Sequence, residues 1–402
     1  MSKLREEKGF VLVLGMLLLL VATVIGVGTV GTATHDLRIS GNKRISEQVF
    51  YVAEGGIHEF MGRFRDGASG ALSDSAPLSP NWKLFIASSA GRAAEIGYSS
   101  GDPNHVFAQS LQSQVDFGME IRHKVDLANN VINEADSPVY IATSHGYAQD
   151  GGNRVIEVEF CGVPGLDPPG ALYSERPVDI LGHSTYIQGM DQCTGGVNKP
   201  GIVTPLSLAS NPINTSGGPD IQGEPSPIKY GYKDLDLLKA VKYLKKDANF
   251  EYDSHIIGTE HSVEQGQLDA RAGKWGTPTS TDTKTPNTYP DSNQMNIVYF
   301  DMHKNGTLTL TGGSRGAGIL LVNGNLQLHG GFTWYGVIIV TGALDFTGGG
   351  EKNVTGGILT GETATVTVDV GGDAGIMYCS NVGRRLKRLV FPFRTTRWRD
   401  VF

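Results

Sequence analysis

Cysteine and charge are both scarce in this chain of 402 residues, and each shortage excludes a class of protein. Three cysteines are too few for a disulfide-rich scaffold, and no Cys-x-x-Cys pair predicts a cysteine-based zinc site. Charged residues make up only 19% of the chain, and its net charge of −7 lacks the basic excess of a nucleic-acid-binding protein. We therefore expect no nucleic acid among its partners.

The odd number of cysteines leaves two interpretations open. One disulfide with one free thiol is the first, and Cys161 and Cys193 are then the candidate pair. Three reduced, buried thiols are the alternative.

Motifs for catalysis and metal binding are missing as well. The ten histidines are scattered, with no H-E-x-x-H motif and no other close pair at ligand spacing. We interpret His183, His303 and His329 as polar surface groups. Four acids could contribute to calcium binding, but they form no repeated G-G-x-G-x-D motif, so solvated acids are favoured: Asp301, Asp345, Asp369 and Asp373. We expect no enzymatic activity, no cofactor and no metal.

The amino terminus contains the longest apolar run of the chain. Residues 10–34 carry no charged side chain, and as a helix they extend about 37 Å, enough to cross a bilayer with some tilt. The polar leader, residues 1–9, has three basic residues that would stay in the cytoplasm. The run is too long for a general secretory signal. A plain signal anchor fits its length but does not account for the helical pattern that follows.

Helical periodicity continues well beyond the membrane-spanning run. Apolar and small residues recur at spacings of three and four, as on one face of a helix: Ile45, Val49, Val52, Gly56, Phe60 and Phe64. The pattern predicts one helix over residues 10–66, about 85 Å long, of which half lies in lipid.

The segment KGFVLVLGMLLLLVATVIGVGTVGTATHDLRISGNKRISEQVFYVAEGGI is similar to the amino-terminal domain of PilX-type minor pilins. The matching features are a Lys-Gly-Phe junction, an uninterrupted apolar helix, the pair Gly41-Asn42, and Ala53-Glu54-Gly55-Gly56 at the end. The similarity covers about residues 5–60.

This resemblance implies that a prepilin peptidase cuts between Gly9 and Phe10 and methylates the new amine of Phe10. It also implies an inner-membrane protein with a single span and its carboxyl terminus outside the cytoplasm, which later enters a pilus filament or its tip. The implied partners are other minor and major pilins, the peptidase, the inner-membrane assembly platform and a large tip adhesin. Glu54 would pair with a basic residue of its own helix or of a neighbouring subunit, or would be a simple surface residue.

Leu14 departs from the pattern of major pilins, which usually carry Glu as the fifth mature residue. That carboxylate neutralises a neighbour's terminal amine inside the apolar bundle, where an unpaired charge is expensive. Leu14 cannot do this, which favours a subunit placed first, at the tip. If apolar packing alone is enough to assemble the subunits, Leu14 says nothing about the position of this subunit in the filament.

Residues 67–165 have the composition of a pilin-like head. Residues 67–110 read as a connector, and three segments then alternate in polarity or are rich in β-formers, around Met119, Ile141 and Val158. The sequence predicts a small antiparallel sheet packed on the helix.

The last third of the chain contains a repeat of six residues, marked by glycine: Gly306, Gly312, Gly318, Gly324, Gly330, Gly336, Gly342 and Gly348. Apolar pairs recur every 18 residues, which predicts a single-stranded β-helix over 296–383, with first rungs at 166–228 and a helical and loop insertion at 229–295. The residue before each glycine is not consistently aliphatic, so the left-handed coil of acyltransferases is disfavoured and a right-handed coil is favoured. The fold class is thus α+β/all-β.

Residues 384–402 form a basic tail that either clamps an acidic partner or packs along the coil. For the whole chain we predict a minor pilin that primes pilus assembly or sits at the filament tip. The tip pseudopilin of a type II secretion system is one alternative, although such subunits usually carry an α-helical insert. A membrane-anchored β-helix enzyme, either an acyltransferase or one active on polysaccharides, is the other.

Overall fold

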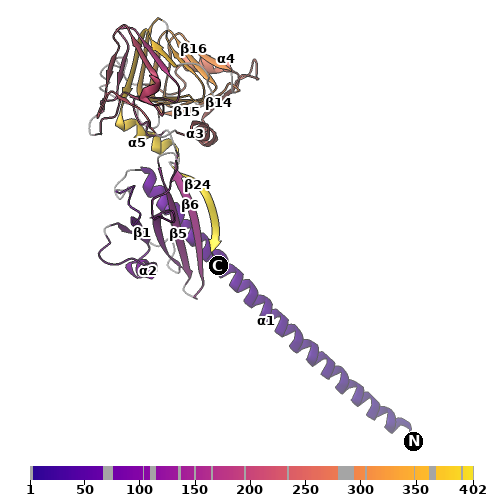
Figure 1. Cartoon of the computed structure of the whole chain (residues 1–402). Coiled ribbons are helices and arrows are strands. Elements are labelled where there is room, and N and C mark those ends of the chain that lie inside the picture. Colours follow the sequence, from indigo (N-terminus) through magenta and orange to yellow (C-terminus); the bar gives the residue numbers. More distant parts are fainter. Residues whose placement is uncertain are drawn as a thin grey trace.

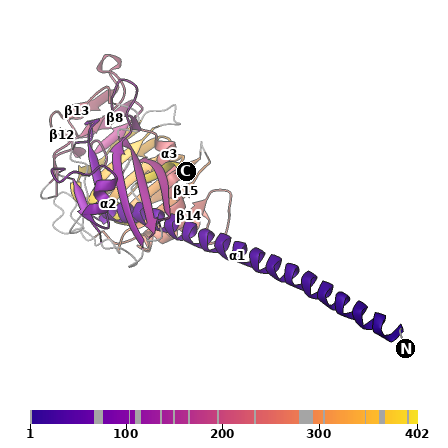
Figure 2. The same cartoon turned by 90° about the horizontal axis from the view of Figure 1, so that it is seen from below.

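A computed structural model gives the chain three parts: a long rod, a head and a bulky β-rich body (Figures 1 and 2). The described residues are 3–66, 76–102, 104–108, 115–134, 137–148, 151–163, 166–193, 196–232, 235–278, 294–303, 306–347, 349–361, 368–390 and 393–401. We call residues 10–44 the rod, and residues 166–390 the body. The head comprises the part of the first helix that follows the rod and the sheet that packs on that part.

The first helix, α1, runs from Lys3 to Asp66 without interruption, as the apolar periodicity predicts. No proline occurs in this span, so every turn keeps its backbone hydrogen bonds. Its last turns bury Val49, Ala53 and Phe60 against the head. The helix approaches the sheet closely because Gly146 faces it, where any Cβ would overlap the backbone of Val49.

The head sheet has the strand order β2-β1-β3-β5-β6-β24. Its elements are β1 (Lys83–Ala87), α2 (Ala90–Glu95), β2 (His105–Phe107), β3 (Val115–His123), β4 (Asn133–Glu134), β5 (Ser137–Ala148), β6 (Asn153–Gly162) and β24 (Phe393–Val401). Strands β3, β5 and β6 are antiparallel and contain the three predicted segments. Met119, Val158 and Phe160 are buried with α1 in one apolar core.

The basic tail packs on the body with its first part and on the head with its second. It forms α5 (Ser380–Leu389) and then β24, which adds to the head as the antiparallel neighbour of β6. The reason is partly electrostatic, because β6 presents Glu157 and Glu159 opposite the arginines of β24. Arg399 Nη2 lies 2.7 Å from Glu157 Oε1. The prediction that the tail packs along the body is therefore confirmed for α5, where Leu386 and Val390 are buried against the larger sheet, and wrong for β24, which joins the head.

The body consists of parallel strands in two sheets, of 11 and 6 described strands. The larger sheet contains β7 (Leu172–Ser174), β9 (Tyr186–Gln188), β10 (Ile202–Val203), β12 (Asp220–Gln222), β13 (Ile228–Lys229), β14 (Phe250–Asp253), β15 (Asn296–Asp301), β17 (Ser314–Asn323), β19 (Phe332–Val340), β21 (Glu351–Thr360) and β23 (Asp373–Tyr378). The smaller contains β8 (Val178–Leu181), β11 (Ile213–Ser216), β16 (Thr307–Thr311), β18 (Asn325–His329), β20 (Leu344–Phe346) and β22 (Val368–Gly371). Leu308 pairs with Leu326 and Leu326 with Leu344, so equivalent residues 18 apart lie side by side.

Both faces of the larger sheet are buried, which explains its continuous apolar strands. Leu320 and Val322 point into the core between the sheets, whereas Ile319 and Leu321 lie under α3 (Leu237–Leu244) and α5. Figure 1 shows these two helices between the body and the head. Leu237 and Ala240 belong to the buried face of α3, whereas Leu238 is 42% exposed.

The order of strands in space differs from their order in the chain. Strands β7, β8 and β9 pair with β21, β22 and β23, so the first strands of the body lie beside its last ones. The chain between β9 and β21 first runs to the opposite end of the larger sheet, where β14 pairs with β15. This segment also contains the short helices η1 (Leu208–Ser210), η2 (Lys245–Asp247) and α4 (Val263–Arg271). The predicted insertion 229–295 thus supplies a strand and the buried Trp275 to the body, and residues 279–293 of its polar loop lie outside the described residues.

This strand order also determines which two cysteines form the disulfide. Cys193 is bonded to Cys379, 186 residues away, and Cys161 is a buried free thiol. The candidate pair Cys161–Cys193 was wrong, because Cys161 lies on β6 of the head. Cys193 follows β9 and Cys379 follows β23, and these two strands are neighbours.

Candidate functional site

The rod is an apolar surface that the chain itself leaves uncovered. Every residue from 10 to 44 is exposed, including Phe10 at 70% and Leu19 at 72%. Monomeric soluble proteins rarely present a contiguous apolar area of this size, so the rod requires lipid or other protein around it. Among the described residues, α1 is the one helix that is long and apolar enough to cross a membrane.

The polar groups within the rod are satisfied locally. The hydroxyl groups of Thr29, Thr32 and Thr34 donate to backbone carbonyls one turn earlier, at 2.8, 3.0 and 2.7 Å. Such hydrogen bonds let threonine remain in an apolar environment without an external partner. Gly26 has open space beside its Cα, so nothing within this chain requires a glycine there.

The predicted processing and register residues all lie on α1, but they do not form one site. Gly9 and Phe10 are at the free end of the helix, followed by Leu14, which is 49% exposed. Glu54 is half-buried in the part of α1 that packs on the head. Leu14 and Glu54 are separated by about 60 Å of helix, so any joint role requires a second subunit.

A polar junction joins the head to the body. Glu134 of β4 forms ion pairs with Lys239 of α3 and Arg394 of β24. Arg394 Nε also donates to Cys161 Sγ at 2.9 Å. Burial raises the pKa of Cys161 to about 11 despite the opposing charge of Arg394, so this thiol stays protonated at neutral pH and is a poor nucleophile.

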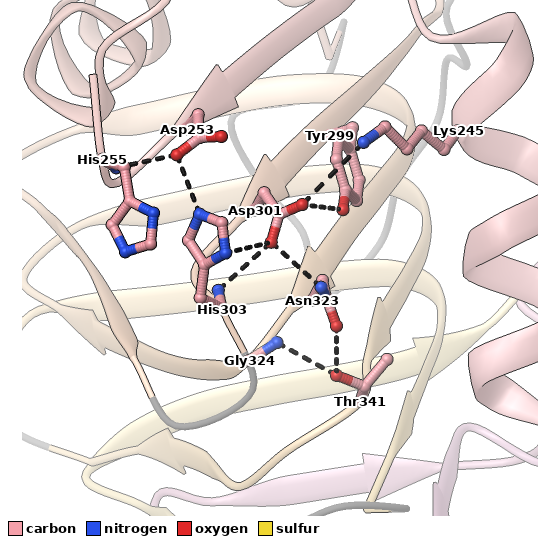
Figure 3. A network of polar contacts seen from close by, with 9 residues as sticks. All are labelled: Lys245, Asp253, His255, Tyr299, Asp301, His303, Asn323, Gly324 and Thr341. Atoms are coloured by element: carbon pink, nitrogen blue, oxygen red, sulfur yellow. Dashed lines mark hydrogen bonds and ion pairs between the residues drawn. The ribbon is translucent and has the colours of Figure 1, made fainter.

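A second cluster lies on the body, at the end of strands β14 and β15, and Figure 3 shows its polar contacts. His303 Nε2 lies 2.9 Å from Asp253 Oδ1, and this hydrogen bond is the largest cause of the raised pKa of His303. The rings of His255 and His303 are stacked with centroids 3.6 Å apart. Asp301 accepts hydrogen bonds from Tyr299 Oη at 2.8 Å and from Asn323 Nδ2 at 3.0 Å.

The statement that no close histidine pair exists was therefore wrong. The missed signal is a repeated Asp-x-His, at Asp253-Ser254-His255 and again at Asp301-Met302-His303. The repeat carries information only when the two strands are known to be neighbours, because 48 residues separate its copies.

The acids considered for calcium are not brought together. Asp345 and Asp369 are neighbours on β20 and β22, whereas Asp301 and Asp373 belong to the other sheet. The ring of His183 is exposed, with Nδ1 3.2 Å from the carbonyl oxygen of Gly218.

Comparison with known proteins agrees with the amino-terminal resemblance. Residues 8–58 match the family model described as PilX N-terminal. Among solved structures, the competence-associated pilin ComZ from Thermus thermophilus matches with 10% identity and a TM-score of 0.27, over 89% of this chain and 97% of that one. The search of curated proteins found no match. From the family match we conclude that residues 8–58, all within α1, form a PilX N-terminal domain.

Proposed function

We propose that this protein is a minor pilin that primes the assembly of a type IV pilus and occupies the filament tip. The observation that carries the proposal is the uncovered apolar rod, which lies within the PilX N-terminal match and is continuous with the head. A surface of this kind is suited to two environments in turn, first the bilayer and then a bundle of similar helices.

Processing between Gly9 and Phe10 would make this transfer easier. The leader carries Lys3, Arg5 and Lys8, which would hold the helix end at the cytoplasmic surface. After their removal the helix begins at an apolar residue, and helix packing can replace lipid around it with little change in exposed apolar area. The inner-membrane stage therefore has one span, with the head and body outside the cytoplasm.

Two features favour the tip. Leu14 offers no carboxylate with which to neutralise the terminal amine of a neighbouring subunit inside an apolar bundle. In addition, Figure 1 shows the body beyond the head, at the end of the molecule opposite the rod. In a bundle of parallel rods, this bulk would obstruct a subunit placed beyond it, whereas subunits on the membrane side meet only the rod and the head.

The partners we propose are other minor and major pilins, the prepilin peptidase, the inner-membrane assembly platform and a large tip adhesin. We also propose that the body is a right-handed single-stranded β-helix without enzymatic activity. The pairing of residues 18 apart in the strands from β16 to β20 supports a coil.

The first experiment expresses the chain with and without a prepilin peptidase and determines the mass of the product. We expect loss of residues 1–9 and a methyl group on Phe10. Gly9→Val should block the cut, whereas Gly15→Val, the same change at a glycine of α1 with open space around it, should be cut normally. A wild-type chain that keeps its leader would overturn the proposal.

The second experiment separates a pilus from a secretion system, because the tip pseudopilin alternative also predicts processing and the missing carboxylate. Deletion of the gene should abolish surface pili, and antibodies against the body should label the ends of sheared fibres. A deletion strain that keeps its pili but fails to export enzymes would favour the pseudopilin.

A further inference from the structure

The repeated Asp-x-His places four side chains that can bind a metal at one corner of the body. Strands β14 and β15 are parallel neighbours, and their register pairs Asp253 with Asp301. Each strand ends at its aspartate, and a histidine follows two residues later in both cases. His255 and His303 therefore follow the ends of adjacent strands, and Figure 3 shows their rings next to each other.

The distances within this corner suit a single small ion. One ligand atom each from Asp253, His255 and His303 lies within 4.8 Å of the other two. In a tetrahedral zinc site, with Zn–N distances of about 2.0–2.1 Å, two ligand atoms are about 3.3 Å apart. Small side-chain rotations are enough to close this difference, because both rings are exposed, and the side chain of His303 is 39% exposed.

The surrounding residues hold His303 in position. Its backbone has a φ of 49°, a left-handed conformation that is uncommon for a residue other than glycine. The backbone N–H of His303 donates to Asp301 Oδ1 at 3.1 Å, and the same oxygen lies 3.8 Å from Nδ1 of its ring. Asp301 thus lies on the Nδ1 side of the ring, beyond hydrogen-bond distance, while Nε2 faces Asp253. A small rotation of the ring would bring Nδ1 into the hydrogen bond with a carboxylate that is usual for metal-bound histidines.

We propose that Asp253, His255 and His303 bind one divalent transition-metal ion of the zinc class. Asp301 is a positioning residue. Imidazole ligands select this class over Ca²⁺ and Mg²⁺, which prefer sites made of oxygen atoms alone. The ion would join β14, the last strand in the order of the larger sheet, to its neighbour β15.

The test uses the full chain in detergent micelles, without a histidine tag and stripped of metal with a chelator. Titration with Zn²⁺ in a calorimeter should give one bound ion per chain, and Co²⁺ should give the visible absorption bands of a site with nitrogen ligands. The double variant His255→Ala/His303→Asn should weaken Zn²⁺ binding about 100-fold or more, and Asp301→Asn about 10-fold. Asparagine is chosen at position 303 because it tolerates a positive φ.

His183→Ala is the matched control, since it removes an exposed histidine of the same body outside the cluster. It should leave the affinity for Zn²⁺ unchanged, and an excess of Ca²⁺ should not displace the bound ion. Circular dichroism in the presence of chelator should show that all variants keep the wild-type fold. Failure of the wild type to bind Zn²⁺, or equal binding by the double variant, would overturn the proposal.

Discussion

Leu19 in the rod is 72% exposed and Leu320 in the body is fully buried, although both belong to long apolar runs. The rod is one straight helix that satisfies its own backbone, so it forms without covering its side chains. A parallel strand forms only beside other strands, so the body buries its apolar residues as it is built. The rod therefore requires lipid or other protein around it, whereas the described strands of the body cover their apolar residues with one another and with helices.

Glycine substitutions should separate the two regions most clearly. Gly336 has a φ of 145°, and a Cβ there would overlap the carbonyl oxygen of Gly318 on the next strand. We expect Gly336→Val to destabilise the body by more than about 3 kcal/mol, because backbone strain and overlap add. Urea unfolding of the full chain in micelles, followed by the fluorescence of the buried Trp275 and Trp334, measures this.

Gly26→Val is its counterpart in the rod, where open space surrounds the glycine. The urea midpoint of the body should not change in this variant. Equal destabilisation by both substitutions would show that the rod and the body do not unfold independently.

Truncation of an apolar side chain should reduce stability when the side chain belongs to the body, and should reduce pilus assembly when it belongs to the rod. Ile338 is fully buried, and Ile338→Ala should reduce the free energy of unfolding by about 2–5 kcal/mol. Leu19→Ala removes an equivalent side chain from the rod and should leave the urea midpoint unchanged, while reducing the number of pili. A Leu19→Ala chain that unfolds as easily as Ile338→Ala would contradict the distinction.

The disulfide joins two parts of the body that meet only through tertiary structure. Replacing both Cys193 and Cys379 by serine should reduce the free energy of unfolding by about 2–4 kcal/mol, because the unfolded chain gains freedom. The urea midpoints of oxidised wild type and variant measure the effect. Reducing agent should lower the midpoint of the wild type and leave that of the double variant unchanged. A variant as stable as the oxidised wild type would show that the bond has no structural role.

The smallest effect we expect is a dependence of the stability of the body on pH. Burial of Asp269 opposes its ionisation, but hydrogen bonds from Lys274, Tyr252 and Gln265 outweigh burial and lower its pKa below 3.8. The stability from this carboxylate is present above the unfolded pKa of 3.8 and is lost as the pH falls through the lower folded value.

Unfolding free energies at about pH 6 and about pH 3 should therefore differ less in Asp269→Asn than in the wild type. Asp36→Asn, at an exposed carboxylate of the rod, is the control and should retain the wild-type difference. An unchanged pH dependence in Asp269→Asn would assign the acid sensitivity of the body to other groups.

Periodic features could be predicted from the sequence alone. The helix α1, the three antiparallel strands around Met119, Ile141 and Val158, and the 18-residue repeat follow from patterns in neighbouring residues. Such patterns are informative because the helix and the strand impose periods of 3.6 and 2 on any sequence that is buried on one side.

Only the tertiary structure decided which distant segments meet. It joined Cys193 to Cys379, placed β24 beside β6, and brought the two Asp-x-His segments together. Each of these contacts depends on the order in which strands stack, and in this body that order differs from the order in the chain. A local pattern can specify that a strand forms, but its neighbour is chosen by the burial and charge of the whole assembled sheet.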